Sequence, residues 1–363
     1  MEGRANTTLP VIHTLENVVR YLDLTPSEYK EILDVSRYYP FAITRHYLSL
    51  IEKDNPLCPI RRQAIPSKEE LRDGGMPDPL NELHDSPTPA FIKKYPGRGV
   101  FLASSTCAVY CRFCNRKRFV GKKGDPRIYW EETFSYIKGN REVQEVIISG
   151  GDPLMLLPEE LEYLLSRLRD IRHVRILRLS TRVPVVYPEG MQRGHLKAIK
   201  RYGPLWIIIH INHPREITNE CIAAIQKMRK AETMLVSQTV LLRQVNDCPH
   251  IMFRLYESLI AQGVKPYYLF QLDEVKGAMH FKVRLERGME IMRFLRKRAS
   301  GLAIPQYVMD VTGGCGKVPV ESITIQGKQK KIYVQGITGK TGIYHNDGKK
   351  SQCIHCGICS EEQ

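Results

Sequence analysis

The sequence predicts an α/β fold: a partial (β/α)6 barrel with a helical N-terminal region and a small C-terminal extension. Short apolar runs rich in β-branched residues recur, about 30 residues apart after the first interval, at 99–105, 143–149, 174–180, 205–211, 234–241 and 266–272. The intervals hold amphipathic helical patterns, such as 158–171 and 218–231. Continuous apolar strands that alternate with helices are typical of parallel βαβ units. Ligands collect at the carboxyl ends of such strands, so we expect the chemistry there.

The barrel, expected over 96–300, is flanked by two segments of different character. Residues 1–95 predict a helical region, in which Thr25 and Pro26 begin a helix and 55–96 form a lead-in arm rich in Pro, Asp and Gly. We expect residues 301–363 to form a C-terminal part with a lysine-bearing loop and a cysteine-rich tail. Within it, 305–311 indicate one further strand and 322–336 a hairpin.

Composition narrows the class of protein. Of 363 residues, 42% are apolar and 26% charged, which excludes collagen-like and wholly disordered chains. The net charge is 54 − 39 = +15. This charge is compatible with nucleic acid or acidic ligands, but the basic residues are scattered and favour a solvated surface. The longest apolar run, 205–209, is too short to cross a bilayer, and the first residues lack the apolar segment of a secretory signal. We therefore expect a cytoplasmic protein.

Ten cysteines are present, and six of them form two tight triplets, a pattern that indicates metal ligation in a reducing compartment. Cys107, Cys111 and Cys114 directly follow the first predicted strand with the spacing Cys-x3-Cys-x2-Cys. Three thiolates can bind three irons of a four-iron cluster and leave the fourth open to a small chelating molecule. Structural zinc sites and electron-transfer clusters normally have four protein ligands, so the triplet favours an open cluster.

The segment DVTGGCGKVPV, residues 310–320, carries Lys317 after a glycine cluster. Such a loop suits a phosphate contact, a Schiff-base lysine for pyridoxal 5′-phosphate (PLP), or an ordinary turn. The order of residues differs from that of a Walker motif, and the spacing alone leaves the other readings open.

The motifs together resemble a known family. The first cysteine triplet is similar to that of radical S-adenosylmethionine (SAM) enzymes, whose cluster binds SAM through the open iron. Combined with Gly-Gly-x-Gly-Lys-x-Pro at 313–319, it resembles the lysine 2,3-aminomutases, from about Lys94 to the C-terminus. The resemblance implies an isomerase that cleaves SAM reductively to a 5′-deoxyadenosyl radical. It also implies 1,2-amino migration on L-lysine to give β-lysine, and a protein electron donor such as flavodoxin or ferredoxin.

The resemblance also implies roles for cofactor-binding residues. Lys317 is expected to be catalytic and to carry PLP, while Arg98 in KYPGR is expected to bind the PLP phosphate through its guanidinium fork. The segment ISGGDPL, 148–154, looks like the glycine-rich part that approaches the SAM amino group, because glycine lets a ligand come close to the backbone. The candidate SAM contacts are Gly150, Gly151, Asp152, His210 and Gln238. For His210 and Gln238, a core-lining role is equally open.

Three charged residues are expected to select the substrate. By resemblance, Arg116 binds the substrate carboxylate, and Asp273 and Asp310 grip the distal ammonium. Two buried carboxylates are costly without a cation, so such a site rejects substrates that lack a distal positive charge. An arginine substrate remains open, because a guanidinium also pairs with two carboxylates. Of Arg116, Lys117 and Arg118, we expect at least one to face solvent.

The second triplet, Cys353, Cys356 and Cys359, is compatible with zinc, a second iron–sulfur cluster or a redox tail. The resemblance implies zinc in a homo-oligomer, with Cys248 of a neighbouring subunit as fourth ligand, which would couple metal binding to assembly. The spacing within this triplet differs slightly from that of the family, and His355 is an alternative ligand. The unassigned cysteines are expected to be small buried residues: Cys58, Cys221 and Cys315.

Other functions remain open at this level. Within the same class, the protein is compatible with an aminomutase that acts on arginine, or with one that makes β-lysine for modification of a translation factor. In different classes are a radical SAM RNA-modifying enzyme, which the charge of +15 would suit, and a non-catalytic iron–sulfur electron carrier.

Overall fold

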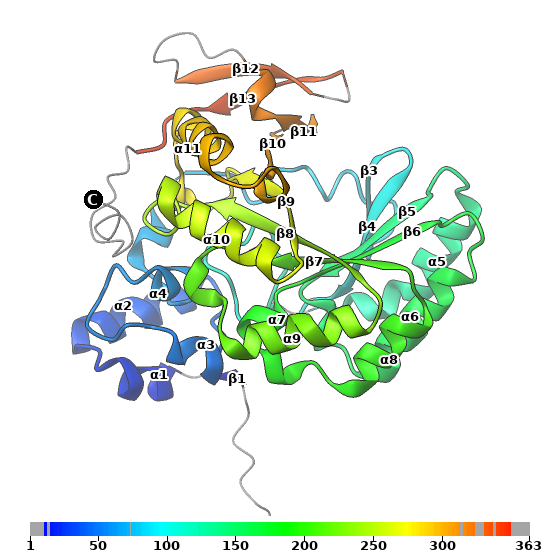
Figure 1. Cartoon of the computed structure of the whole chain (residues 1–363), viewed down its shortest axis with the longest axis horizontal. Coiled ribbons are helices and arrows are strands. Elements are labelled where there is room, and N and C mark those ends of the chain that lie inside the picture. Colours follow the sequence, from blue (N-terminus) through cyan, green and yellow to red (C-terminus); the bar gives the residue numbers. More distant parts are fainter. Residues whose placement is uncertain are drawn as a thin grey trace, which may run out of the picture.

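The computed structural model describes residues 11–12, 15–72, 74–122, 124–312, 315–323, 330–336 and 339–349. Its centre is a nine-stranded sheet in the order β11-β10-β9-β8-β7-β6-β5-β4-β3, curved into an open barrel (Figure 1). The strands are β3 (Phe91–Tyr95), β4 (Arg98–Ser104), β5 (Glu145–Gly150), β6 (Ile176–Thr181), β7 (Leu205–His210), β8 (Met234–Leu241), β9 (Lys265–Gln271), β10 (Gln306–Val311) and β11 (Gly316–Pro319).

The six predicted strands are β4 to β9, and each runs parallel to the next, which confirms the partial barrel. The further strand expected at 305–311 is β10, also parallel to β9. Antiparallel strands β3 and β11 form the two edges and were not predicted. The sheet therefore extends past both ends of the range 96–300.

Helices between the strands cover the outer face of the sheet (Figure 1). They are α5 (Trp130–Gly139), α6 (Pro158–Arg169), α7 (Val183–Val186), α8 (Arg193–Arg201), α9 (Asn219–Lys230), α10 (Pro249–Ala261) and α11 (Leu285–Arg298). The apolar residues that predicted these elements are the ones that pack in the core. In α6, Leu161, Leu164, Leu165 and Leu168 are fully buried at helical spacing, and in β7 Leu205, Ile207 and Ile209 are fully buried. None of the described helices is long and apolar enough to cross a membrane.

The N-terminal region is helical, as expected. It contains β1 (Val11–Ile12), α1 (Leu15–Leu22), α2 (Pro26–Ser36), β2 (Ile43–Thr44), α3 (Arg45–Ser49), α4 (Pro59–Ala64) and the 3-10 helix η1 (Lys68–Leu71). Thr25 caps α2 in a capping box with Glu28, and Pro26 occupies the first turn, which confirms the predicted helix start. The lead-in arm then runs to β3 and contributes two buried carboxylates, Glu70 and Glu82.

The C-terminal part corrects one expectation. A hairpin was predicted at 322–336, but β12 (Lys331–Gln335) pairs with β13 (Thr341–His345), so the hairpin lies farther along the chain. Residues 324–329 lie outside the described residues. In the main sheet, β10 and β11 pair antiparallel and set Asp310 directly opposite Lys317.

The two edges of the open barrel meet at one hydrogen bond. The backbone N–H of Lys317, on edge strand β11, donates to Tyr95 Oη, from edge strand β3, at 2.8 Å. Arg98, which begins β4, lies over the ring of the same tyrosine, 4.1 Å from its centroid. The residues predicted to hold PLP therefore lie on either side of this seam.

Candidate active site

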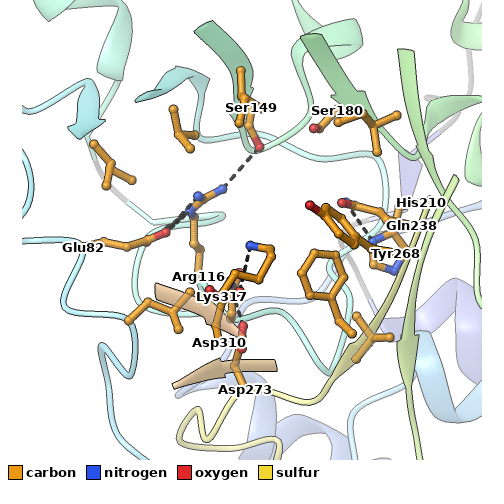
Figure 2. A pocket seen from close by; sticks show the side chains of 18 of the residues that line it. Glu82, Arg116, Ser149, Ser180, His210, Gln238, Tyr268, Asp273, Asp310 and Lys317 are labelled. Carbon is orange, nitrogen blue, oxygen red and sulfur yellow. Dashed lines mark hydrogen bonds and ion pairs between the residues drawn. The ribbon is translucent and has the colours of Figure 1, made fainter. Parts of the chain in front are cut away.

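A cavity of about 340 Å³ is lined by residues of β3 to β11, by the end of the lead-in arm and by the cysteine-bearing loop after β4 (Figure 2). It brings together most of the predicted site residues: Arg98, Cys111, Cys114, Arg116, His210, Gln238, Asp273, Asp310 and Lys317. The others do not line it: Cys107, Gly150, Gly151, Asp152 and Cys248. Residues separated by more than 200 positions thus converge in one cavity: the cysteine loop, His210 and Asp273 lie at carboxyl ends of parallel strands, whereas Arg98 begins β4.

Lys317 and the two aspartates form an uneven charge cluster. Lys317 Nζ lies 3.0 Å from Asp310 Oδ2 (Figure 2). Asp273 Oδ2 accepts a hydrogen bond from Asn115 at 3.1 Å, while its Oδ1 has no partner among the described residues. Burial and the Asp310 charge raise the pKa of Asp273 to about 7. Burial opposes the charge of Lys317, but Asp310 outweighs it and raises the pKa of the lysine. The cluster thus contains two carboxylates and one lysine amine, and it can accept a second cation.

Aromatic side chains line the cavity next to Lys317. Its Nζ lies 5.0 Å from the ring centroid of Phe270 and 5.8 Å from that of Tyr268. The Tyr267 hydroxyl donates to the Tyr268 hydroxyl at 2.8 Å. Sequence reasoning identified this strand but missed its aromatic residues. The available signal was strand alternation, because Tyr268 and Phe270 are two residues apart and share a face.

The three cysteines of the first triplet influence one another but do not converge on a point. Burial, with Asp152, Cys114 and Cys111 nearby, holds the pKa of Cys107 well above its usual range. Burial raises the pKa of Cys114 to about 11. Across the described part of the chain, no three His, Cys, Asp or Glu side chains are arranged to hold a single metal ion. The three thiols lie close enough to interact electrostatically, so one loop brings together the ligands that an iron–sulfur cluster would need.

Four basic side chains of the cysteine loop are anchored by the two glutamates of the arm. Glu70 pairs with Arg112 at 2.7 Å and with Lys117 at 2.6 Å. Glu82 pairs with the other two, Arg116 at 2.8 Å and Arg118 at 2.6 Å. Although burial opposes ionisation, the arginines lower the pKa of Glu82 to about 2.

This anchoring corrects the expectation that one of the basic residues after Cys114 faces solvent. Side-chain exposure is only 14% for Arg116, 6% for Lys117 and 18% for Arg118. Sequence reasoning missed Glu70 and Glu82. The only signal was the density of positive charge over 112–118, which requires counter-charges once the loop is buried.

Arg116, the residue predicted for the substrate carboxylate, lines the cavity with its guanidinium already oriented. Its Nε and Nη2 form a fork with Glu82, and Nη1 reaches Ser149 Oγ at 3.3 Å (Figure 2). The fork fixes the plane of the guanidinium, because two parallel bonds leave it little rotational freedom.

The glycine-rich segment after β5 packs against the loop that leads to the cysteines. Gly150 has φ +113°, and a Cβ atom there or at Gly151 would overlap with the backbone of Ser104 or Thr106. Gly151 N–H donates to Ser104 O at 2.5 Å, and Asp152 N–H donates to Thr106 O at 2.8 Å. These glycines therefore allow close backbone approach, but toward the cysteine loop and not along the cavity.

Asp152 is buried, and protein groups already occupy its carboxylate. It accepts hydrogen bonds from the Thr181 hydroxyl at 2.7 Å and from the backbone N–H groups of Leu154, Arg182 and Val183. This carboxylate joins the loops after β5 and β6, which is a structural role close to the cysteines.

His210 and Gln238 line the cavity from β7 and β8. His210 stacks on Phe113 with centroids 5.4 Å apart, and burial together with Arg182 lowers the pKa of the imidazole to about 3. Gln238 Nε2 lies 3.5 Å from His210 Nδ1, and His210 Nε2 has no partner among the described residues. The histidine is therefore neutral and has one ring nitrogen available to a ligand.

The predicted zinc site stays a prediction. Cys248 is buried at the start of α10, whereas Cys353, Cys356 and Cys359, with the alternative ligand His355, lie outside the described residues. The expectation for the unassigned cysteines is confirmed, because Cys58, Cys221 and Cys315 are buried.

Comparisons with known proteins define the class. A family model described as Radical SAM superfamily matches residues 102–252, the part that carries the cysteine loop and strands β5 to β8. Together with the barrel and the three-cysteine loop, this match defines a radical SAM domain. Among solved structures, SuiB of Streptococcus suis bound to S-adenosylmethionine covers 60% of this chain and 51% of its own, with a TM-score of 0.46 and 14% identity.

Curated relatives then define the family. A putative L-lysine 2,3-aminomutase of Aquifex aeolicus is 42% identical over 92% of both chains. The L-lysine 2,3-aminomutase of Clostridium subterminale is 37% identical over 96% of this chain and 85% of its own. A glutamate 2,3-aminomutase of Clostridioides difficile is 36% identical over 85% of this chain and 74% of its own. The chain belongs to the lysine 2,3-aminomutase family.

The packing at Gly151 gives a first prediction. Gly151→Ala should lower the free energy of unfolding by about 1–3 kcal/mol, because the new Cβ overlaps with the Thr106 carbonyl and forces the two loops apart. Urea denaturation followed by circular dichroism measures the change. Gly139→Ala is the matched control, since nothing lies within 4 Å of that position in α5, and it should be neutral or stabilising. Equal stability of Gly151→Ala and the parent would contradict the steric account.

Glu82 gives a second prediction. Glu82→Gln should cost about 3–5 kcal/mol of unfolding free energy at pH 7, because Arg116 loses its paired carboxylate and Arg118 loses one of the two carboxylates it contacts, Glu82 and Asp78. The folded pKa of about 2 lies below the usual 4.5, so the carboxylate stabilises the fold above pH 4.5, and this contribution is lost as the pH falls toward 2.

The difference between parent and Glu82→Gln should therefore shrink across that acid range when urea midpoints are measured against pH. Glu232→Gln serves as control, because this glutamate is 72% exposed and pairs only with Lys200 at the surface. A Glu82→Gln penalty as small as that of the control would refute the anchoring role.

Proposed function

We propose that this protein is a radical SAM, PLP-dependent lysine 2,3-aminomutase that converts L-lysine to β-lysine by moving the amino group from Cα to Cβ. One observation carries the proposal: a single cavity contains the amine of Lys317, the guanidinium of Arg98, two carboxylates and two cysteines of the triplet. The family and the names of its relatives support the same activity.

The residues of the cavity fit the cofactors that this function requires. Lys317 would attach PLP, and Arg98 would bind its phosphate beside the aromatic wall of Tyr268 and Phe270. The first cysteine triplet would hold a [4Fe-4S] cluster. SAM would lie beside His210 and Gln238, where the buried His210 Nε2 lacks a partner. When bound, these groups supply a carbon radical that removes hydrogen and a ring that carries the migrating nitrogen.

The protein's own part is to hold the substrate and balance its charges. Arg116, oriented by Glu82, would bind the α-carboxylate, and Asp273 and Asp310 would bind the distal ammonium. In the free protein the Lys317 ammonium pairs with Asp310, the same carboxylate that the substrate ammonium would use. Asp310 therefore neutralises whichever ammonium is present. Such fixed partners restrict the substrate to one orientation, which is a large part of the catalytic effect expected here.

Charge within the cavity, and not overall identity, selects the substrate. The relatives named for lysine have identities of 35–42% to this chain, and the relative named for glutamate has 36%. Two buried carboxylates that share one lysine would repel a glutamate side chain and would remain unpaired with an uncharged one. A site that depends on such a partner discriminates by about 10⁴-fold or more. The same negative charge disfavours a polyanion such as RNA as substrate.

The remaining parts of the proposal concern partners. Reductive cleavage of SAM consumes one electron, so a flavodoxin or ferredoxin is proposed as donor. Zinc at the second cysteine triplet and Cys248 would join subunits of a homo-oligomer. A reducing compartment such as the cytoplasm is proposed as well, because two tight cysteine triplets indicate metal ligation and not a disulfide scaffold.

An anaerobic assay of the iron-reconstituted protein with PLP, SAM and a reductant tests the function. L-Lysine should be converted to β-lysine, with arginine a weaker substrate and glutamate inert. Asp273→Asn should lose at least about tenfold in kcat/KM for lysine but keep PLP binding, because it removes a substrate partner only. Lys317→Ala should lose the visible absorbance of bound PLP. Turnover of glutamate in preference to lysine would defeat the proposal.

The affinity for lysine should depend on pH. Asp273 is neutral below its pKa of about 7 and charged above it, whereas the substrate's distal amine stays protonated from pH 6 to 8. Lysine binding measured by calorimetry should therefore tighten as the pH rises through 7, by up to about tenfold per unit below that value. In Asp273→Asn this dependence should disappear. A flat profile in the parent protein would contradict the assignment.

A further inference from the structure

Arg182 lies between the cysteine loop and the barrel wall. It directly follows β6, and its guanidinium is 7% exposed. Nη1 donates to Cys111 Sγ at 2.7 Å. Nothing in the sequence pattern pointed to this residue, because 71 positions separate it from the cysteine.

The other side of the guanidinium is held by three partners from distant segments. Nη2 donates to Glu216 at 2.7 Å, to Gln63 at 2.7 Å and to Tyr47 at 2.9 Å. Glu216 is itself fixed, since it accepts from the Tyr47 hydroxyl at 2.6 Å and from the backbone N–H groups of Asn212 and His213. The charge of Arg182 is therefore fixed in place next to one thiol.

The environment of this contact strengthens its electrostatic effect. The guanidinium carbon lies 5.2 Å from the ring centroid of Tyr47 and 5.4 Å from that of Phe113, so the group is enclosed by aromatic surface and screened from water. Charges around the triplet are uneven. Cys111 has a cation in hydrogen-bond contact, whereas Cys107 has the Asp152 carboxylate as its neighbour.

We propose that Arg182 is a positioning residue that sets the reduction potential of the cluster through Cys111, with Glu216 partly offsetting its charge. The inference rests on the cluster in the proposed function. Reduction adds one electron to a cluster already ligated by thiolates, so a fixed cation hydrogen-bonded to a ligand sulfur stabilises the reduced form and raises the potential. Glu216, on the far side of the same guanidinium, acts in the opposite direction.

The test is a redox titration, followed by electron paramagnetic resonance, of the full-length protein after anaerobic iron–sulfur reconstitution and without SAM. Arg182→Gln should shift the midpoint to lower potential, because it keeps a donor but removes the charge. Arg182→Lys should lie between Arg182→Gln and the parent. Glu216→Gln should shift the midpoint to higher potential. A merely structural role would not give opposite signs at two residues of the same ion pair.

Lys282→Gln is the matched control, since it removes a buried cation whose partners, Glu274 and Asp347, lie outside the cysteine loop. Its midpoint should equal that of the parent. Iron and sulfide content verifies loading of each variant, and if Arg182→Gln fails to load, the shifts of Arg182→Lys and Glu216→Gln decide. Unchanged midpoints, or shifts of equal sign, would overturn the inference. A parent protein that takes up no cluster would instead overturn the proposed function.

Discussion

The arrangement of the whole site depends on ion pairing around one buried loop. Each of four basic side chains between residues 112 and 118 pairs with a carboxylate of the N-terminal arm, which supplies Glu70, Asp78 and Glu82. Removing water from such charges is costly unless each has a partner, so the loop can adopt this position only when the arm is in place. The arm is therefore part of the site, although its sequence predicts only helices and turns.

Within the cavity, by contrast, the pairing of charged groups is incomplete. Lys317 pairs with Asp310, whereas Asp273 accepts a hydrogen bond from Asn115, and burial together with the Asp310 charge raises the pKa of Asp273 to about 7. The basic side chains of the loop find their partners within the protein, whereas the carboxylates of the cavity would be fully paired once a cationic ligand binds. The cost of burying an unpaired charge therefore accounts both for the stability of the loop and for the specificity proposed for the cavity.

Sequence reasoning succeeded where function or folding leaves a local pattern. Strands β4 to β9 were predictable because each has apolar residues on the face that the helices bury, and nine residues lining the cavity followed from compact motifs and the family resemblance. Edge strands β3 and β11 are short, with polar residues in FIKKY and GKVP, and gave no such run. Glu70, Glu82 and Arg182 were missed because their ion pairs join positions 34 to 47 residues apart, and the Arg182–Cys111 contact spans 71. Separations of this kind leave no periodicity to detect.

The seam between Tyr95 and Lys317 has a mechanical consequence. Backbone hydrogen bonds join all the neighbouring strands of the sheet, whereas in the described part of the chain the hydroxyl of Tyr95 connects the two edge strands. Under the proposed function, a coenzyme bound by Arg98 beside one edge and by Lys317 on the other edge would cross-link the two edges of the open barrel. Coenzyme binding would then raise the free energy of unfolding as well as supply the reactive group, because a ligand bound only by the folded state stabilises that state.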